Sequence, residues 1–234
     1  MTDFMKARRA MVERQVEGRG VSDPRLLEAM RAVPREAFVD PADADLAHED
    51  MPLSIGAGQT ISQPYIVALM IEAASLQPSD RALEVGAGSG YAAAVMGRLV
   101  ERVHAIERIP ELADAAAARL EALDFANVEV AVGDGTLGWP DAAPFDAILV
   151  AAGAPAVPEA LKRQLAPGGR LVIPVGTGDV QRLLRITRGE DDRFEEEQIE
   201  AVRFVPLVGE QGWQDTKPAT SRRGNERIRK ETGR

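Results

Sequence analysis

Short apolar runs alternate with amphipathic segments through the middle of the chain, between residues 62 and 175. The apolar runs predict strands at residues 81–85, 102–106, 128–132, 146–151 and 170–175. The amphipathic segments predict helices at residues 64–76, 90–100, 110–123 and 158–165. Strands that alternate with helices of this length are typical of βαβ units. Because right-handed crossovers place helices on both faces, we expect an α/β fold with a Rossmann-like, doubly wound and mostly parallel sheet.

The first 60 residues follow a different pattern, with two amphipathic helices and no strand signal. The second helix has a clear beginning, because Asp23 is a good N-cap and Pro24 fits the first helical position. Residues 40–60 look irregular and lead into a glycine-containing loop at 54–62. We therefore expect an N-terminal helical region, residues 1–60, added to the α/β core.

After residue 175 the pattern changes to a period of two. Polar and apolar residues alternate at 181–188 and 198–207, and the sequence Gly-Glu-Asp-Asp at 189–192 is typical of a turn. This predicts a C-terminal antiparallel hairpin, residues 181–207, that closes one edge of the sheet.

The last 21 residues, 214–234, show no apolar periodicity and hold seven Lys or Arg against three Asp or Glu. We expect a disordered basic tail there. The remaining residues, 1–213, are predicted to form one domain whose cofactor-binding core covers residues 62–175.

Composition excludes several classes of protein. The 234 residues include no Cys and two His, which excludes a thiolate nucleophile, a disulfide scaffold and a Cys- or His-rich metal centre. A net charge of −9 disfavours nonspecific binding to nucleic acid. The sequence shows no membrane-length apolar run and no signal-peptide pattern, so we expect a cytoplasmic protein without a membrane partner.

The strongest chemical signal is the glycine-rich turn Leu-Glu-Val-Gly-Ala-Gly-Ser-Gly-Tyr at 83–91, between a predicted strand and a predicted helix. Glycine lets the backbone adopt positive φ and approach a ligand, and the helix start offers free N–H groups. A tight turn without a ligand is the simpler alternative. Because the glycines at 86, 88 and 90 do not have the Gly-x-Gly-x-x-Gly spacing, the turn argues against a nicotinamide dehydrogenase.

Two carboxylates lie at the ends of the next strands. Glu107 follows Gly86 by 21 positions, where a carboxylate can bind the ribose hydroxyls of an adenosine. Asp134, between two glycines, suits an adenine amino group. The alternatives are a solvated strand end and an ordinary Asp turn. The carboxyl ends of parallel strands meet at one edge of the sheet, so we expect both residues beside the glycine turn.

These segments resemble the protein-L-isoaspartate O-methyltransferases, class I enzymes that use S-adenosylmethionine. The resemblance covers residues 11–207 and rests on the glycine turn together with Gly-Gln-Thr-Ile-Ser-Gln-Pro-Tyr at 58–65 and Ala-Ile-Glu-Arg-Ile-Pro-Glu-Leu at 105–112. The glycine turn by itself indicates only a methyltransferase, whereas the Thr-Ile-Ser-Gln-Pro segment favours this family. One departure is Val-Ala-Ala-Gly-Ala at 150–154, where a threonine is more usual.

The resemblance implies methylation of the free α-carboxylate of L-isoaspartyl residues in damaged proteins and peptides, which initiates their repair. It implies S-adenosyl-L-methionine as cofactor, S-adenosyl-L-homocysteine as product and no metal; a monomer is favoured. Ser62 would occupy the active-site serine position. The implied cofactor-binding residues are Gln59, Thr60, Ile61, Ser62, Gly86, Ala87, Gly88, Glu107, Arg108, Asp134 and Gly135.

The chemistry agrees with this composition. A carboxylate nucleophile is already ionised at pH 7, so a strong general base is not required. Ser62 could orient this carboxylate through a hydrogen bond, or it could simply cap the helix that begins near Pro64. Two further alternatives are a small-molecule methyltransferase on the same fold and a cofactor-binding module without catalysis.

Overall fold

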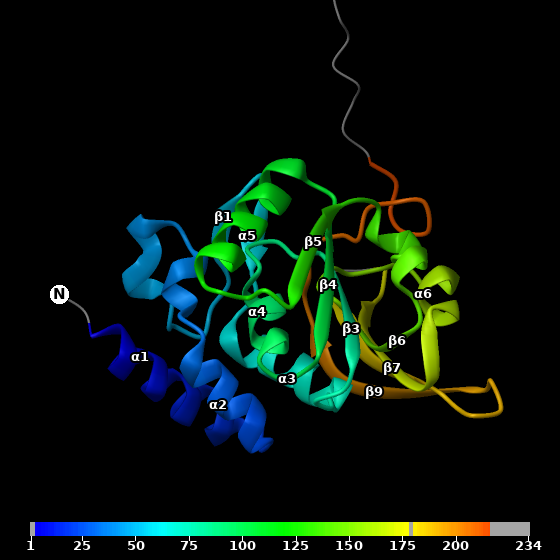
Figure 1. The fold of residues 1–234 in the computed structure, drawn as a ribbon, viewed down its shortest axis with the longest axis horizontal. Coiled ribbons are helices and arrows are strands. Elements are labelled where there is room, and N and C mark those ends of the chain that lie inside the picture. Colours follow the sequence, from blue (N-terminus) through cyan, green and yellow to red (C-terminus); the bar gives the residue numbers. More distant parts are fainter. Residues whose placement is uncertain (1–2, 178–179, 216–234) are drawn as a thin grey trace, which may run out of the picture.

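Seven strands form one sheet in the order β5-β4-β3-β6-β7-β8-β9 (Figure 1). The structure is a computed structural model that describes residues 3–177 and 180–215. The parallel strands are β3 (Arg81–Val85), β4 (Arg102–Glu107), β5 (Val128–Val132), β6 (Phe145–Val150) and β7 (Leu165–Val175). The antiparallel strands are β8 (Gln181–Arg188) and β9 (Phe194–Val202). The expected α/β class, with a mostly parallel sheet and a C-terminal hairpin, is confirmed.

Helices cover both faces of this sheet. Figure 1 shows α3 (Pro64–Ala74), α4 (Tyr91–Gly97) and α5 (Pro110–Ala122) on one side and α6 (Glu159–Arg163) on the other. Successive residues of β3 point to opposite faces, so that Ala82 joins the apolar cluster under α3 and α4 while Leu83 joins the cluster on the α6 side. The central strands are thus buried on both faces, which explains their apolar sequences.

The N-terminal region packs outside α3 and α4 rather than on the sheet. Its helices are α1 (Phe4–Met11) and α2 (Pro24–Ala32), with a π-helical turn at Val12–Val16 between them. Asp23 caps α2 as predicted, because its carboxylate accepts a hydrogen bond from the backbone N–H of Arg25 at 2.8 Å. The expected N-terminal helical addition is therefore present.

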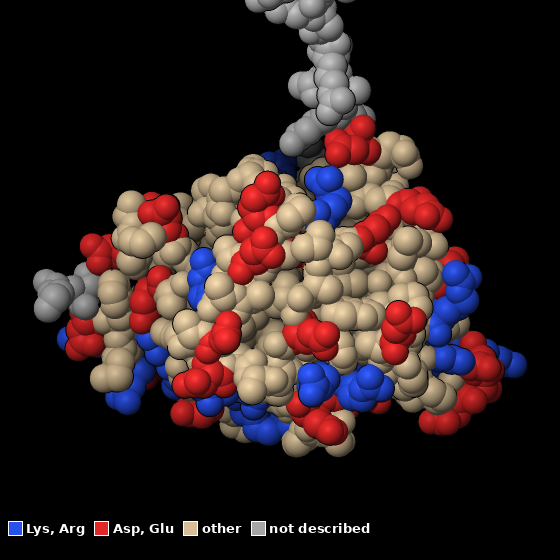
Figure 2. All heavy atoms as spheres, turned by 45° about the horizontal axis from the view of Figure 1, so that its top comes forward, with Lys and Arg blue, Asp and Glu red and all other residues tan. Residues whose placement is uncertain are grey.

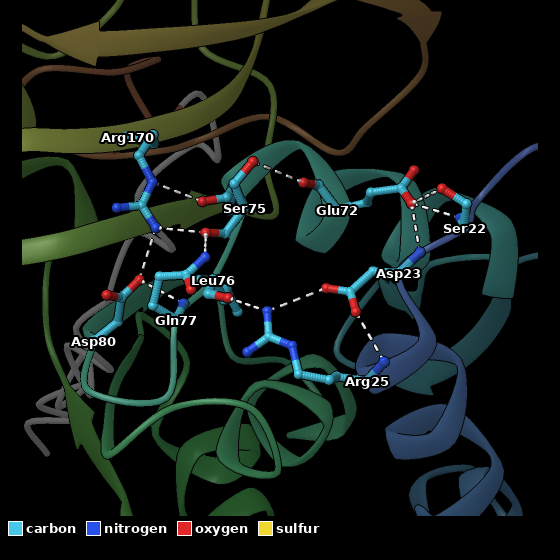
Figure 3. Close-up of polar contacts among 10 residues, drawn as sticks. Ser22, Asp23, Arg25, Glu72, Ser75, Leu76, Gln77, Asp80 and Arg170 are labelled. Carbon is cyan, nitrogen blue, oxygen red and sulfur yellow. Dashed lines mark hydrogen bonds and ion pairs between the residues drawn. The ribbon is translucent and has the colours of Figure 1, made fainter.

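Polar contacts fix the end of α3 against its neighbours (Figure 3). Arg170 on β7 donates from Nε to the carbonyl oxygen of Ala74, and Arg25 on α2 donates to that of Leu76, at 2.8 and 2.6 Å. Glu72 accepts two backbone N–H groups that precede α2, at 2.6 and 3.0 Å. Cations at the carboxyl end of a helix complement its dipole, so this network holds α3 in place between the sheet and the N-terminal region.

The prediction of an irregular loop at 54–62 is wrong in part. Strands β1 (Leu53–Gly56) and β2 (Gln59–Ile61) form a separate antiparallel hairpin. Its tip is a turn at 56–58, where all three residues have positive φ. Strands of three or four residues are too short to show alternation, so their sequence gives little signal.

The C-terminal hairpin also differs from its predicted bounds. β9 begins at Phe194 rather than at residue 198, because an edge strand exposed on both faces does not alternate polar and apolar residues. Residues 203–207 leave the sheet and return to the cleft described below. Most of the predicted disordered tail, 216–234, lies outside the described residues.

Acidic and basic side chains are interspersed over the face of the molecule shown in Figure 2. Between residues 3 and 215, with 178 and 179 left aside, every helix is too short or too polar to cross a membrane.

Candidate active site

A crevice opens where the strand order reverses, at the carboxyl ends of β3 and β6. The chain leaves β3 toward α4 on one face and leaves β6 toward α6 on the other. Backbone hydrogen bonds continue just past both strand ends, from Gly86 N to Ile106 O and from Ala151 N to Val85 O, each at 2.8 Å. Ligands of open α/β sheets bind at this kind of switch point.

The glycine-rich turn forms the floor of the crevice. Gly86, Gly88 and Gly90 have φ values of 88°, 53° and 88°, a region that residues with a side chain rarely adopt. Space is also limited, because a Cβ at Gly88 would lie 3.2 Å from Cδ1 of Ile55 on β1. The β1–β2 hairpin therefore lies directly over the glycine turn.

Two pockets share this floor. The first pocket extends from Ser62 to Tyr91, beside α3 and α4, and the second extends from Gln59 to Gly135 across the ends of β3 and β4. The two linings have Thr60, Gly86, Gly88 and Ala151 in common, so they form one continuous cleft. Ten of the eleven predicted cofactor residues line this cleft: Gln59, Thr60, Ile61, Ser62, Gly86, Ala87, Gly88, Glu107, Arg108 and Gly135.

Glu107 is held in the second pocket by two backbone N–H groups. Its Oε2 accepts from Gly88 and its Oε1 accepts from Ile109, both at 2.9 Å. The side chain is only 7% exposed, but each carboxylate oxygen has a further lone pair to offer. This fixed carboxylate at the strand end is suited to a pair of ribose hydroxyls, and that role stays a prediction.

Asp134 is placed differently from the other predicted residues. It lies outside the linings of both pockets, and its Oδ1 accepts from the backbone N–H and the hydroxyl of Thr136, at 2.9 and 2.7 Å. Its Oδ2 accepts from the backbone N–H of Glu210 at 2.7 Å. Asp134 thus anchors the segment that follows Val208, which itself lines the second pocket. The contact of Asp134 with adenine stays a prediction.

Glu84 is a site residue that the sequence reasoning missed. It lines the first pocket, is 2% exposed, and its Oε2 has no hydrogen-bond partner among the described residues. Burial, and then the negative charge of Glu107, raises the pKa of the Glu84 carboxyl to about 8. The sequence did offer a signal for this residue, because Glu84 is an acidic side chain within an otherwise apolar strand segment. A buried carboxyl with a free oxygen fits the ammonium group of a methionine moiety, so this end of the cleft suits the expected cofactor.

Ser62 lies between the first pocket and a third pocket, which is lined by Gln63, Ile66, Arg203 and Phe204 among others. Its hydroxyl has no hydrogen-bond partner within residues 3–177 and 180–215. The capping alternative is not what the structure shows. Gln63 is the N-cap of α3, and the free N–H of Tyr65 is accepted by Asp50 instead.

Metal-binding side chains do not converge in the described part of the chain, since no group of three His, Asp or Glu residues there could hold an ion. Besides backbone amides, the polar residues that line the cleft are Gln59, Thr60, Ser62, Glu84, Ser89, Tyr91, Glu107 and Arg108.

Comparisons with known proteins agree with this geometry. The family model Protein-L-isoaspartate(D-aspartate) O-methyltransferase matches residues 6–212. Protein-L-isoaspartate O-methyltransferase 2 of Pelobacter propionicus is 59% identical over 207 residues, covering 88% of this chain and 92% of that protein. The protein-L-isoaspartate O-methyltransferase of Rhodopseudomonas palustris is 60% identical over 210 residues, covering 89% and 96%.

The fold comparison gives the same result. A Plasmodium falciparum structure, named as a protein-L-isoaspartate O-methyltransferase in complex with S-adenosyl-L-homocysteine, matches with a TM-score of 0.76 and 26% identity. The match covers 86% of this chain and 98% of that one. With the family model, the close relatives and the fold in agreement, the chain belongs to the protein-L-isoaspartate O-methyltransferase family of class I methyltransferases.

Proposed function

We propose that this protein transfers the methyl group of S-adenosyl-L-methionine to the free α-carboxylate of L-isoaspartyl residues in damaged proteins and peptides. The observation that carries the proposal is the position of Ser62. Its unpartnered hydroxyl lies where the cofactor cleft meets the third pocket. Family membership and relatives of about 60% identity support the substrate class.

The cleft offers a separate contact for each part of the cofactor. Glu84 would hold the ammonium group in the first pocket, and Glu107 would hold the ribose hydroxyls in the second. Backbone groups at Gly135 would face the adenine. When bound, S-adenosyl-L-methionine would supply a methyl carbon that is activated by the positively charged sulfur, with S-adenosyl-L-homocysteine as the leaving product.

The chain's own contribution to the reaction is orientation. The substrate carboxylate is ionised at neutral pH, so the Ser62 hydroxyl has only to donate a hydrogen bond and aim one carboxylate oxygen at the methyl carbon. Holding two reactants in line is equivalent to a very high effective concentration of one reactant at the other. Ile55 lies against Gly88, so the β1–β2 hairpin packs on the glycine turn.

The third pocket is the proposed site of the peptide around the isoaspartyl residue. Among the described residues of its lining, Arg203 is the one charged side chain, and its guanidinium is a hydrogen-bond donor. Salt screens the long-range repulsion between an acidic substrate and a chain whose net charge is −9. The cytoplasmic location and the monomeric state expected from the sequence stay predictions.

The proposal is tested with a radiolabelled methyl donor and two peptides that differ only in isoaspartate or aspartate at one position. We expect base-labile label on the isoaspartyl peptide and none on the aspartyl peptide. The Ser62→Ala variant should keep its fold and methylate more slowly. Equal labelling of the two peptides, or no labelling of either, would refute the proposed function.

A further inference from the structure

The amino end of α3 is held by residues from the N-terminal region. Pro64 has no N–H, so Tyr65 carries the first backbone donor of the helix. That donor is accepted by Asp50 Oδ1 at 3.2 Å. Asp50 is itself fixed by Arg19, whose Nη1 donates to Oδ2 at 2.8 Å while its guanidinium lies 3.4 Å from the centre of the Tyr65 ring.

A second contact holds Ser62, two residues before the first residue of the helix. Arg35 is fully buried, and its Nη2 donates to the carbonyl oxygen of Ser62 at 2.8 Å while its Nε donates to that of Ala47 at 2.7 Å. Its guanidinium also lies 4.7 Å from the centre of the Tyr91 ring, at the start of α4. Burial lowers the pKa of the Arg35 guanidinium, and the nearby Tyr91 and Asp50 oppose that shift.

These contacts leave the side chain of Ser62 free. Asp50 takes the N–H of Tyr65, which is three residues after Ser62 and is the group that a capping serine at that position would bind. Arg35 takes the Ser62 carbonyl. Neither Asp50 nor Arg35 lines the first, second or third pocket, so both residues hold the backbone near Ser62 from outside the cleft.

We propose that Asp50 and Arg35 are positioning residues for methyl transfer. Arg35 fixes the backbone at Ser62, and Asp50 accepts the helix-start N–H in place of Ser62, so that the Ser62 hydroxyl is available to the substrate carboxylate. Two residues of the N-terminal region would then position the active-site serine. This inference rests on the proposed function. A displacement of the hydroxyl by about 1 Å would be enough to slow the reaction substantially.

The test compares Asp50→Ala with Asp50→Asn and with a matched control, Asp23→Ala. Asp23 caps α2 in the same region through a similar hydrogen bond, and its contact with α3 is at Glu72, near the carboxyl end of that helix rather than at Ser62. We expect Asp50→Ala to lower kcat about tenfold without changing the Kd of S-adenosyl-L-homocysteine. Asp50→Asn, which keeps an acceptor oxygen, should recover most of the rate, and Asp23→Ala should leave kcat unchanged.

A double-mutant cycle separates positioning from general destabilisation. If Asp50 acts through the Ser62 hydroxyl, Asp50→Ala should cost little further rate in a Ser62→Ala background. An equal fold-loss in both backgrounds, or a kcat of Asp50→Ala no lower than that of Asp23→Ala, overturns the inference while wild-type methylation still upholds the proposed function. Absence of wild-type methylation overturns both. Because Arg35 is fully buried, Arg35→Lys serves only as a supporting variant, with a lowered kcat expected.

Discussion

Glu84 gives the sharpest quantitative prediction, because its carboxyl is buried at the first pocket with one oxygen unpartnered among the described residues. The perturbation is Glu84→Gln, which keeps the size and shape of the side chain and removes the titratable group. Glu111→Gln is a matched control, since it makes the same chemical change at an exposed position on α5.

The magnitude follows from the pKa of the Glu84 carboxyl, which burial raises from 4.5 to about 8. Because the pKa is higher in the folded state, the folded protein binds more protons than the unfolded chain between these two values. The stability of the wild-type protein therefore falls as pH rises through this window, by about 1.4 kcal/mol per pH unit. Between pH 5 and pH 7 the loss is about 3 kcal/mol, and it levels off below the window and above it.

The assay is urea unfolding of the wild-type protein, Glu84→Gln and Glu111→Gln at several pH values from 5 to 9. Other titrating groups cancel in the difference between variant and wild type. The free energy of unfolding of Glu84→Gln, relative to wild type, should rise by about 3 kcal/mol from pH 5 to pH 7, and that of Glu111→Gln should stay level. A difference for Glu84→Gln that does not change with pH would refute the reasoning.

Cofactor binding extends the same prediction. An ammonium group beside Glu84 favours the ionised carboxylate, so binding of S-adenosyl-L-homocysteine near pH 7 should release a proton. Calorimetry in two buffers of different ionisation enthalpy measures that release, which should decrease in Glu84→Gln. Equal proton release in the two proteins would show that Glu84 does not contact the ammonium group.

Three further predictions concern the neighbouring contacts. Glu107→Gln should weaken S-adenosyl-L-homocysteine binding by about tenfold or more, because charge-assisted hydrogen bonds are lost; an unchanged Kd in calorimetry would remove Glu107 from the cofactor site. Asp134→Ala should lower stability by about 1–3 kcal/mol, since the N–H and hydroxyl of the buried Thr136 lose their acceptor, and should weaken cofactor binding more than peptide binding; the reverse order would contradict the assignment. Arg170→Met should lower the free energy of unfolding by about 3 kcal/mol, because the half-buried pair with Asp80 is broken, and intact stability in urea would show that the clamp on α3 is unimportant.

The sequence predicted the parts of this protein that depend on local pattern. The strands at 81–85 and 128–132 have these bounds in the structure, and the glycine turn with its three left-handed residues lies at the expected strand end. Alternation, turn chemistry and helix-start signals involve neighbours in the chain, so a sequence displays them directly. Ten of the predicted cofactor residues meet in one cleft, because parallel strands end at the same edge of a sheet.

The tertiary structure decided what depends on distant partners. The short β1–β2 hairpin lacks a pattern of its own, and the shifted pKa of Glu84 arises only when a strand is buried on both faces. The two carboxylate oxygens of Asp134 accept hydrogen bonds from Thr136 and from Glu210, which is 76 positions away. Whether Ser62 caps its helix or stays free was settled by Asp50 and Arg35, from a region whose sequence shows only two helices. Hydrogen bonds between such distant residues follow from the packing of the whole chain, because each requires backbone groups that only the folded sheet and helices bring together.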